Sequence, residues 1–168
     1  MNEACMKGEV TSPVGESRTV VVERLRPRMK NPRALKTLSD DGVRLLDVAL
    51  KAVEKANLSI PPEKFGIIVG LQKLSWAEEE LAIARREGAD HLQPLWLLKH
   101  LPNIPAAQIA IETGAHGICQ TIMGKDSAAE AKALAARWLK RDEVEKVLLV
   151  LIHESAGGTS ASARIVGK

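Results

Sequence analysis

Residues 118–153 read, in order, ICQTIM, GKD, SAAEAKALAARWLK, RDE and VEKVLLVLIH. The stretch predicts a short strand over Ile118–Met123, an alanine-rich helix over Ser127–Lys140 and a second strand over Val144–His153. The centre of the second strand is almost wholly apolar, which is typical of a strand covered on both faces. A strand, a helix and a strand in this order predict a parallel pair in an α/β fold.

The sequence on both sides extends this alternation. Further elements with clear ends are the strand Thr19–Leu25 before Arg26-Pro27, the helix from about Leu38 to Asn57 with Ser39-Asp40-Asp41 as its cap, the strand Phe65–Gly70, the helix Ala106–Thr113 before Gly114, and the strand Ser160–Val166 after Gly157-Gly158. A charged helix over Trp76–Arg86 and an apolar turn over residues 94–98 are expected between them. The order β-α-β-α-β-α-β-β predicts a mixed, mostly parallel sheet whose last hairpin adds one antiparallel strand.

Length and composition fit one soluble domain. The chain has 168 residues, of which 45% are hydrophobic and 27% charged. Residues 1–18 hold Gly, Ser, Pro and scattered charge without periodicity, so we expect a flexible N-terminal arm and one domain over residues 19–168. The longest apolar stretch, Val147–Ile152, is far shorter than the roughly 20 residues of a membrane helix. With two cysteines and no run fit for a signal peptide, a cytoplasmic location is expected.

Charge and aromatic content argue against nucleic acid. The 24 Lys and Arg residues are mixed with 21 Asp and Glu residues, and no Tyr and one Phe leave little material for base stacking. The basic stretch from Arg24 to Lys36 predicts either a solvated face or a contact with an acidic partner.

No cofactor or metal site is predicted. Gly124-Lys125 differs from a phosphate-binding loop, because Asp126 stands where that loop has Ser or Thr. Cys119 lies within a predicted strand and is interpreted as a buried small hydrophobe rather than a nucleophile. The histidines are scattered without metal-ligand spacing, at His91, His100, His116 and His153.

The residues around Asp126 suit the start of a helix. Ser127-Ala128-Ala129-Glu130 has the form of a capping box, in which Ser127 and Glu130 each accept a hydrogen bond from a backbone N–H. Asp126 suits the positive end of a helix dipole. Helix capping therefore explains these residues without a catalytic role, and the residues alone leave the function open.

One longer stretch resembles a known family. Residues 101–117 read LPNIPAAQIAIETGAHG, and Thr121 follows after three further residues. This pattern is similar to the β-ketoacyl synthases of fatty-acid and polyketide assembly, in which Asn-x-x-Ala-x-x-Ile-Ala precedes Gly-x-x-Gly-Pro-x-x-Thr. The family's nucleophilic cysteine lies five residues after the threonine, a position that Asp126 occupies here. The resemblance covers about residues 19–167 and implies a thiolase-like fold.

Departures from the family pattern bear on function. Ile118 replaces the proline after the second glycine, and Lys125-Asp126 replace the alanine–cysteine pair of the nucleophile. A carboxylate cannot form the thioester that carries an acyl chain through a Claisen condensation. The resemblance also ends where the first half of the thiolase-like fold ends, whereas the family's paired histidines come from the second half. It therefore implies a ketosynthase-like N-terminal half with no condensing activity.

Two classes of function follow from this resemblance. The first is a non-catalytic subunit that acts through protein contacts in fatty-acid or polyketide biosynthesis, similar in logic to the chain-length factors. The alternative is an acyl-thioester enzyme of different chemistry that uses Asp126, together with His116 or His153. A scaffold built from copies of this chain alone is a third option.

The resemblance also implies partners. In the family, the strand matching residues 118–123 pairs antiparallel with its twofold mate, which predicts a dimer interface that includes Ile118, Gln120, Ile122 and Met123. The mate is a second copy or a ketosynthase, and an acyl carrier protein is a further expected partner. No nucleic acid or membrane partner is expected. The segment Ala128–Leu139 is apolar almost all the way round, which predicts a helix buried on more than one side.

Overall fold

The computed structural model describes residues 7–73, 78–92 and 96–167, and its centre is one five-stranded sheet. The strand order is β1-β5-β4-β2-β3, with β1 at Lys7–Thr11, β2 at Phe65–Leu71, β3 at Cys119–Met123, β4 at Lys146–Ser155 and β5 at Gly158–Gly167. Strand β2 is parallel to both β3 and β4, whereas β5 is antiparallel to β4 and to β1. The predicted mixed, mostly parallel sheet with a C-terminal hairpin is therefore confirmed.

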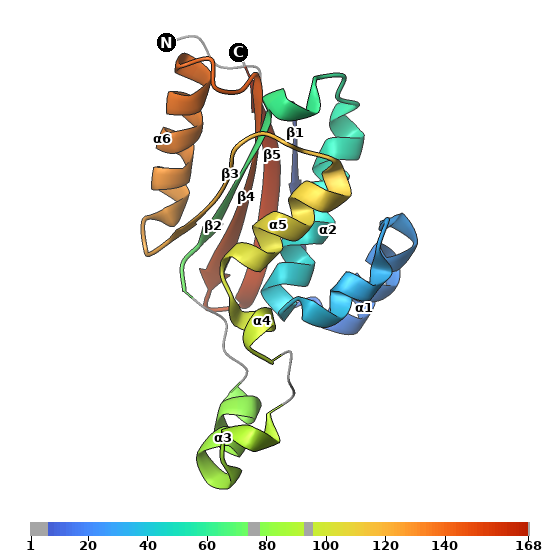
Figure 1. Ribbon diagram of the computed structural model, residues 1–168, viewed down its shortest axis with the longest axis vertical. Helices are drawn as coiled ribbons and strands as arrows, with labels where there is room; N and C mark the ends of the chain where they lie inside the picture. Colours follow the sequence, from blue (N-terminus) through green and yellow to red (C-terminus); the bar gives the residue numbers. More distant parts are fainter. Residues whose placement is uncertain (1–6, 74–77, 93–95, 168) are drawn as a thin grey trace.

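Helices cover the two faces of the sheet unequally (Figure 1). Helices α2 (Asp40–Ala56) and α5 (Asn103–Thr113) lie on one face, and α1 (Arg18–Leu25) packs against α2. Helix α6 (Ser127–Lys140) lies on the other face, against β2, β3 and β4. Consecutive residues of β4 alternate between the two cores, since Leu148 and Val150 pack on the α2 side and Leu149 and Leu151 on the α6 side. The centre of β4 is thus buried on both faces, as its apolar sequence predicts.

Local signals fix the ends of the long helices. The side chain of Ser39 accepts a hydrogen bond of 3.1 Å from the Gly42 N–H at the start of α2, and Asn57 ends that helix in the left-handed conformation with φ 44°. Gly114 ends α5 in the same way, with φ 72°. The predictions for α2, α5 and α6 are confirmed.

Residues 7–25 differ from the prediction. Residues 19–25 form helix α1 rather than a strand, because Val21 and Leu25 lie one helical turn apart and are both buried in the α2-side core. The first strand is instead β1, at Lys7–Thr11, which lies inside the segment predicted to be a flexible arm and pairs with β5. Residues 1–6 of that arm lie outside the described part of the chain.

Helix α3 (Glu78–Glu87) lies away from the sheet, whereas the short α4 (Trp96–His100) packs against α5 (Figure 1). Residues 76 and 77 of the predicted charged helix and residues 94 and 95 of the predicted apolar turn lie outside the described part of the chain. Short 3-10 turns lie at Arg26–Arg28, Pro32–Thr37, Pro62–Lys64 and Ala89–His91. Among the described residues, no helix is both long and apolar enough to cross a membrane.

Candidate functional site

The loop from β3 to α6 places Asp126 at the carboxyl edge of the parallel strands. The chain leaves β3 at Met123 and turns through Gly124, whose φ of 134° favours glycine. The Gly124 N–H donates to the Leu71 carbonyl at 3.0 Å, which ties the end of β3 to the end of β2. Helix α6 then begins with its N-terminus at this edge, where helix dipoles favour negative charge.

Asp126 precedes α6, but its side chain forms no capping hydrogen bond. Its backbone carbonyl accepts hydrogen bonds from the N–H groups of Ala129 and Glu130, at 2.9 and 3.0 Å. Ser127 is the first residue of the helix and is buried, so it is not in the position of an N-cap. The predicted capping box is wrong, and the exposed Asp126 carboxylate is not used to hold the helix end.

The start of α6 packs closely on β2. A Cβ atom on Gly70 would lie 2.6 Å from Leu151 Cδ2 and 3.4 Å from the Ser127 carbonyl oxygen. A side chain at position 70 would therefore push Leu151 or the first turn of α6 away from the sheet.

Of the two histidines proposed as partners of Asp126, only His153, near the carboxyl end of β4, lies towards the same edge of the sheet. His116 precedes β3, whereas Asp126 follows it, so the length of the strand lies between them; the His116 N–H donates to the Pro62 carbonyl at 2.9 Å. His153 lies on β4, where its Nε2 atom is 2.7 Å from Ser162 Oγ on β5. His116 is therefore brought to the wrong end of β3 for chemistry at Asp126.

Cys119 is exposed, and its predicted burial is wrong because β3 is an edge strand. Partial burial of the thiol nevertheless raises its pKa, which keeps it protonated near neutral pH. It is the first residue of β3 and lies at the opposite end of the strand from Asp126. Among the described residues, no group of three or more His, Cys, Asp or Glu side chains is placed to hold a metal ion.

The outer edge of β3 combines apolar side chains with an open strand. Within the described chain, β3 pairs with β2 alone and ends the sheet. Ile118 and Met123 are 37% and 42% exposed, and Gln120 is also exposed. Ile122 is half-buried and packs against the α6-side core. Three of the four predicted interface residues are thus accessible, and the fourth has a role inside the protein.

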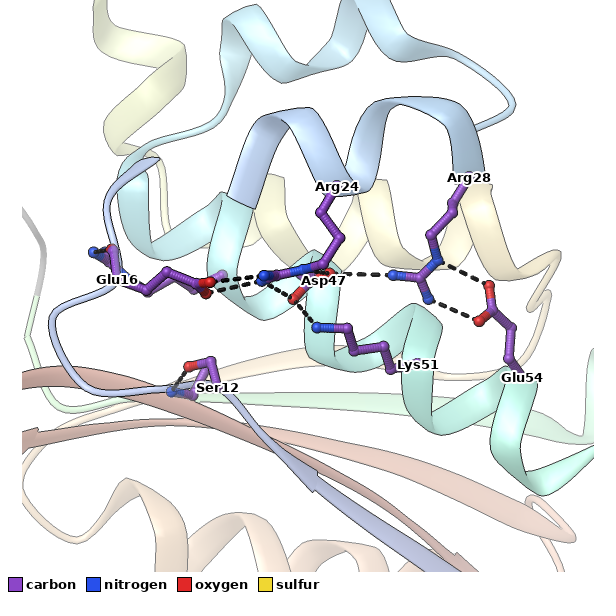
Figure 2. Close-up of polar contacts among 9 residues, drawn as sticks. Ser12, Glu16, Arg24, Arg28, Asp47, Lys51 and Glu54 are labelled. Carbon is purple, nitrogen blue, oxygen red and sulfur yellow. Dashed lines mark hydrogen bonds and ion pairs between the residues drawn. The ribbon is translucent and has the colours of Figure 1, made fainter. Parts of the chain in front are cut away.

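A cluster of charged side chains joins α1 to α2, on the face of the sheet that α2 covers (Figure 2). Asp47, whose side chain is completely buried, pairs with Arg24 Nη2 at 2.7 Å, Arg28 Nη1 at 3.1 Å and Lys51 Nζ at 2.7 Å. Arg24 also binds Glu16 through two hydrogen bonds of 2.7 and 2.8 Å, and Arg28 binds Glu54. Sequence reasoning missed this cluster, although an aspartate on the apolar face of α2 was a signal for it.

The pKa values in the cluster follow from this pairing. Burial alone would raise the pKa of Asp47, but hydrogen bonds from Arg24 and Lys51 hold it below its ordinary value. The hydrogen bond from Arg24 likewise lowers the pKa of Glu16, and the two carboxylates raise the pKa of Arg24. These groups hold the fold together in fixed charge states, and part of the basic stretch is neutralised within the chain.

The overall arrangement of the sheet and its helices is similar to that of known structures. No family model matches the chain, and no curated protein matches it. The chain has the ketosynthase-like thiolase fold, because solved ketosynthase structures align with 97% of it at TM-scores up to 0.72. The predicted resemblance and fold class are therefore confirmed at the level of the fold.

Three of these structures have similar TM-scores and similarly low sequence identities to the chain. The first is a type II polyketide synthase acyl-carrier protein in complex with its ketosynthase bound to the hexaketide, with TM-score 0.72 and 16% identity. The second is the ishigamide ketosynthase/chain length factor, with TM-score 0.71 and 14% identity. The third is the ketosynthase ApeO in complex with its chain length factor ApeC from Xenorhabdus doucetiae, with TM-score 0.67 and 14% identity. Our chain is covered to 97% in each, and it spans 62%, 61% and 78% of those chains.

Proposed function

We propose that this chain is a non-catalytic, β-ketoacyl-synthase-like subunit that acts through protein contacts in fatty-acid or polyketide biosynthesis. The observation that carries the proposal is the residue at the start of α6. The family pattern has its nucleophilic cysteine at the position of Asp126, and a carboxylate cannot take over thioester formation. Cys119 does not substitute for it, since it lies at the far end of β3 and its pKa is raised.

The similar structures support a role through partners. Two of them are a ketosynthase with a chain length factor, and one includes an acyl-carrier protein. By analogy, this chain would pair with a catalytically competent ketosynthase or with a second copy of itself, and would work with an acyl carrier protein.

The edge strand β3 supports the proposed interface. An unpaired strand edge with exposed apolar side chains is a template for pairing with another chain. Ile118, Gln120 and Met123 are exposed along this edge, next to open backbone groups in the described chain. Antiparallel pairing of β3 with its mate would bury these side chains and extend the sheet across the dimer.

A second candidate function rests on the side chain of Asp126. Its carboxylate is exposed and forms no capping hydrogen bond, so helix capping no longer accounts for it. This favours the alternative, an acyl-thioester enzyme of different chemistry that uses Asp126. Against the alternative, His116 lies at the opposite end of β3 and His153 is hydrogen-bonded to Ser162.

The experiment begins with the tagged chain purified from its native source. Mass spectrometry of the bound proteins is expected to find a ketosynthase that carries an active-site cysteine. The reconstituted pair should condense acyl and malonyl thioesters, whereas the chain alone should not. A chain that forms C–C bonds without a partner overturns the proposal.

Substitutions in the reconstituted pair separate the two functions. Asp126→Asn removes the charge and keeps the size of the side chain, and Asp90→Asn makes the same change at an exposed residue of the α3 region. If the chain acts only through protein contacts, the pairs containing the two variants should condense thioesters at equal rates. Loss of acyl-thioester turnover in Asp126→Asn alone favours the alternative enzyme.

A further inference from the structure

Helix α6 forms a ridge of small side chains on the outside of the molecule. Its buried side holds Ala131, Ala135 and Trp138, whereas Ala129 and Ala133 on the opposite side are exposed. Within the described chain α6 is thus buried on one side, and burial of a second side stays a prediction. A cavity of about 380 Å³ lies between α6 and β3, and a second of about 300 Å³ lies between α6 and β5.

The cavity beside β5, which we call the α6–β5 groove, is apolar with a cationic rim. Its apolar lining comes from both the helix and the sheet, through Ala135, Ala136, Leu139, Leu149 and Val166. Its charged lining is Lys132 and Lys140 on α6 and Arg164 on β5. No acidic side chain is among its described lining residues. The groove therefore suits an apolar group with negative charge beside it.

The charge of the rim argues against a second copy of this chain in the groove. A twofold contact through α6 would place Lys132 and Lys140 of one copy next to the same residues of the other. Like charges brought together in an interface oppose association. The rim therefore favours an occupant with acidic groups over an α6-to-α6 contact between copies.

The shape of the surface favours a helix over a small ligand. A site for a small ligand encloses most of the ligand surface, whereas this groove continues onto the exposed alanine ridge. Residues Ala129, Ala133 and Ala136 have side chains of one methyl group, so the backbone of another helix can approach α6 closely. Larger side chains of that helix can then enter the groove.

We propose that the α6–β5 groove binds an acidic amphipathic helix of a partner protein. Apolar side chains spaced at i, i+4 and i+7 would fill the groove, and flanking Glu or Asp residues would meet Lys132 and Lys140. This inference deepens the proposed function. It rests on that function, because it assumes that the chain acts through protein contacts. It names the chemistry of the partner at a surface separate from the β3 edge.

The test is an NMR titration of the full-length, ¹⁵N-labelled chain with a synthetic helical peptide. The peptide carries leucines at i, i+4 and i+7 and flanking glutamates, and the matched peptide carries lysines instead. The glutamate peptide is expected to shift the amide signals of Ala136, Leu139 and Val166 and to bind more weakly as salt is raised. The Lys132→Glu/Lys140→Glu variant should weaken binding by about tenfold or more, and Lys55→Glu, at an exposed residue of α2, should not.

Several results would overturn this inference. One is equal binding of the glutamate and lysine peptides, and another is signal shifts confined to residues outside the groove. A third is that sodium dodecanoate, but not the glutamate peptide, shifts the groove signals, which would assign the groove to a small anionic amphiphile. Co-purification of a ketosynthase tests the proposed function separately, because it does not depend on the titration.

Discussion

Gly117 packs so closely against Phe65 that a Cβ atom on Gly117 would lie 2.5 Å from the Phe65 carbonyl oxygen. The same atom would lie 3.0 Å from the carbonyl oxygen of Glu63. Next to it, the Ile67 N–H donates to the Ile118 carbonyl at 2.8 Å. The segment before β3 is therefore held on the start of β2 by backbone contacts that leave no room for a side chain.

The Gly117→Ala variant should lower the free energy of unfolding by about 1–3 kcal/mol, because rigid backbone atoms meet the added methyl group. The matched control is Gly157→Ala, where the nearest atom to the added Cβ would be 3.7 Å away. That control should change stability by less than about 0.5 kcal/mol. Urea unfolding of both variants makes the comparison, and equal stability would show that the close contact is absent.

Asp47→Ala should destabilise the protein by about 1.5–3 kcal/mol, because it removes the buried carboxylate that accepts hydrogen bonds from the cations around it. Glu54→Ala removes the outer carboxylate of the same cluster, whose side chain is 60% exposed. Exposed pairs contribute up to about 1 kcal/mol, so this control should cost no more than that. Thermal and urea unfolding would measure both. Similar losses of unfolding free energy in the two variants would show that burial does not increase the contribution of Asp47 to stability.

The same cluster should make stability depend on pH. Pairing lowers the pKa of Asp47 and Glu16 in the folded protein below the ordinary values of 3.8 and 4.5. The unfolded chain therefore binds more protons at these groups as the pH falls towards those values. The stabilisation is present above the ordinary pKa values and is lost as the pH falls through the lower, folded values.

We expect the free energy of unfolding to decrease as the pH is lowered below about 5. Asp47→Asn should make this decrease shallower, since it removes one of the two titrating groups. Urea unfolding at a series of pH values would measure the slopes. An unchanged slope in the variant would show that Asp47 does not contribute to the acid sensitivity.

Helices α2 and α6 could be predicted almost to the residue, because their signals are local. In α2, apolar periodicity, Ser39 and Asn57 all agree on the same bounds. The segment of α1 could not be predicted in this way, because its run of valines has strand propensity. Its helix is favoured by contacts with α2, including the pairing of Arg24 with Asp47, which lies 23 residues further along the chain.

The position of Asp126 could be predicted from the sequence, but the geometry around it could not. The strand–turn–helix was evident from residues 118–140, whereas the true N-cap and the burial of Ser127 depend on how α6 sits against Gly70. Similarly, the exposure of Cys119 depends on β3 being at the sheet edge, which is set by strand order rather than by local sequence.

Asp126→Ala should change the free energy of unfolding by less than about 0.5 kcal/mol, because the side chain forms no capping hydrogen bond and the backbone bonds to Ala129 and Glu130 remain. Ser39→Ala, which removes the capping hydrogen bond at the start of α2, should cost about 1 kcal/mol. Thermal melts would compare the two. A larger loss in Asp126→Ala than in Ser39→Ala would restore the capping interpretation.

Asp126→Cys should not give the isolated chain condensing activity, although it restores the thiol that the family pattern has at this position. A thiolate alone lacks the groups that activate the malonyl thioester, and the described chain places His116 at the other end of β3. Product formation from acyl and malonyl thioesters would be followed by mass spectrometry, with the original chain as the blank. C–C bond formation by this variant alone would mean that the remaining machinery lies within the chain.

The last prediction concerns the proposed interface at β3. Ile118→Glu should weaken association of the chain with its mate by about tenfold or more, because an unpaired carboxylate would have to be buried between two strands. Ile118 suits this test better than Ile122, since Ile122 packs against the α6-side core and its substitution would also disturb the fold. Val20→Glu is the matched control, as Val20 is 48% exposed and lies on α1, outside the β3 edge. Light scattering and sedimentation would measure association of the chain with itself and with the ketosynthase that co-purifies with it. If Ile118→Glu and Val20→Glu associate as tightly as the original chain in both settings, the β3 edge is not the interface.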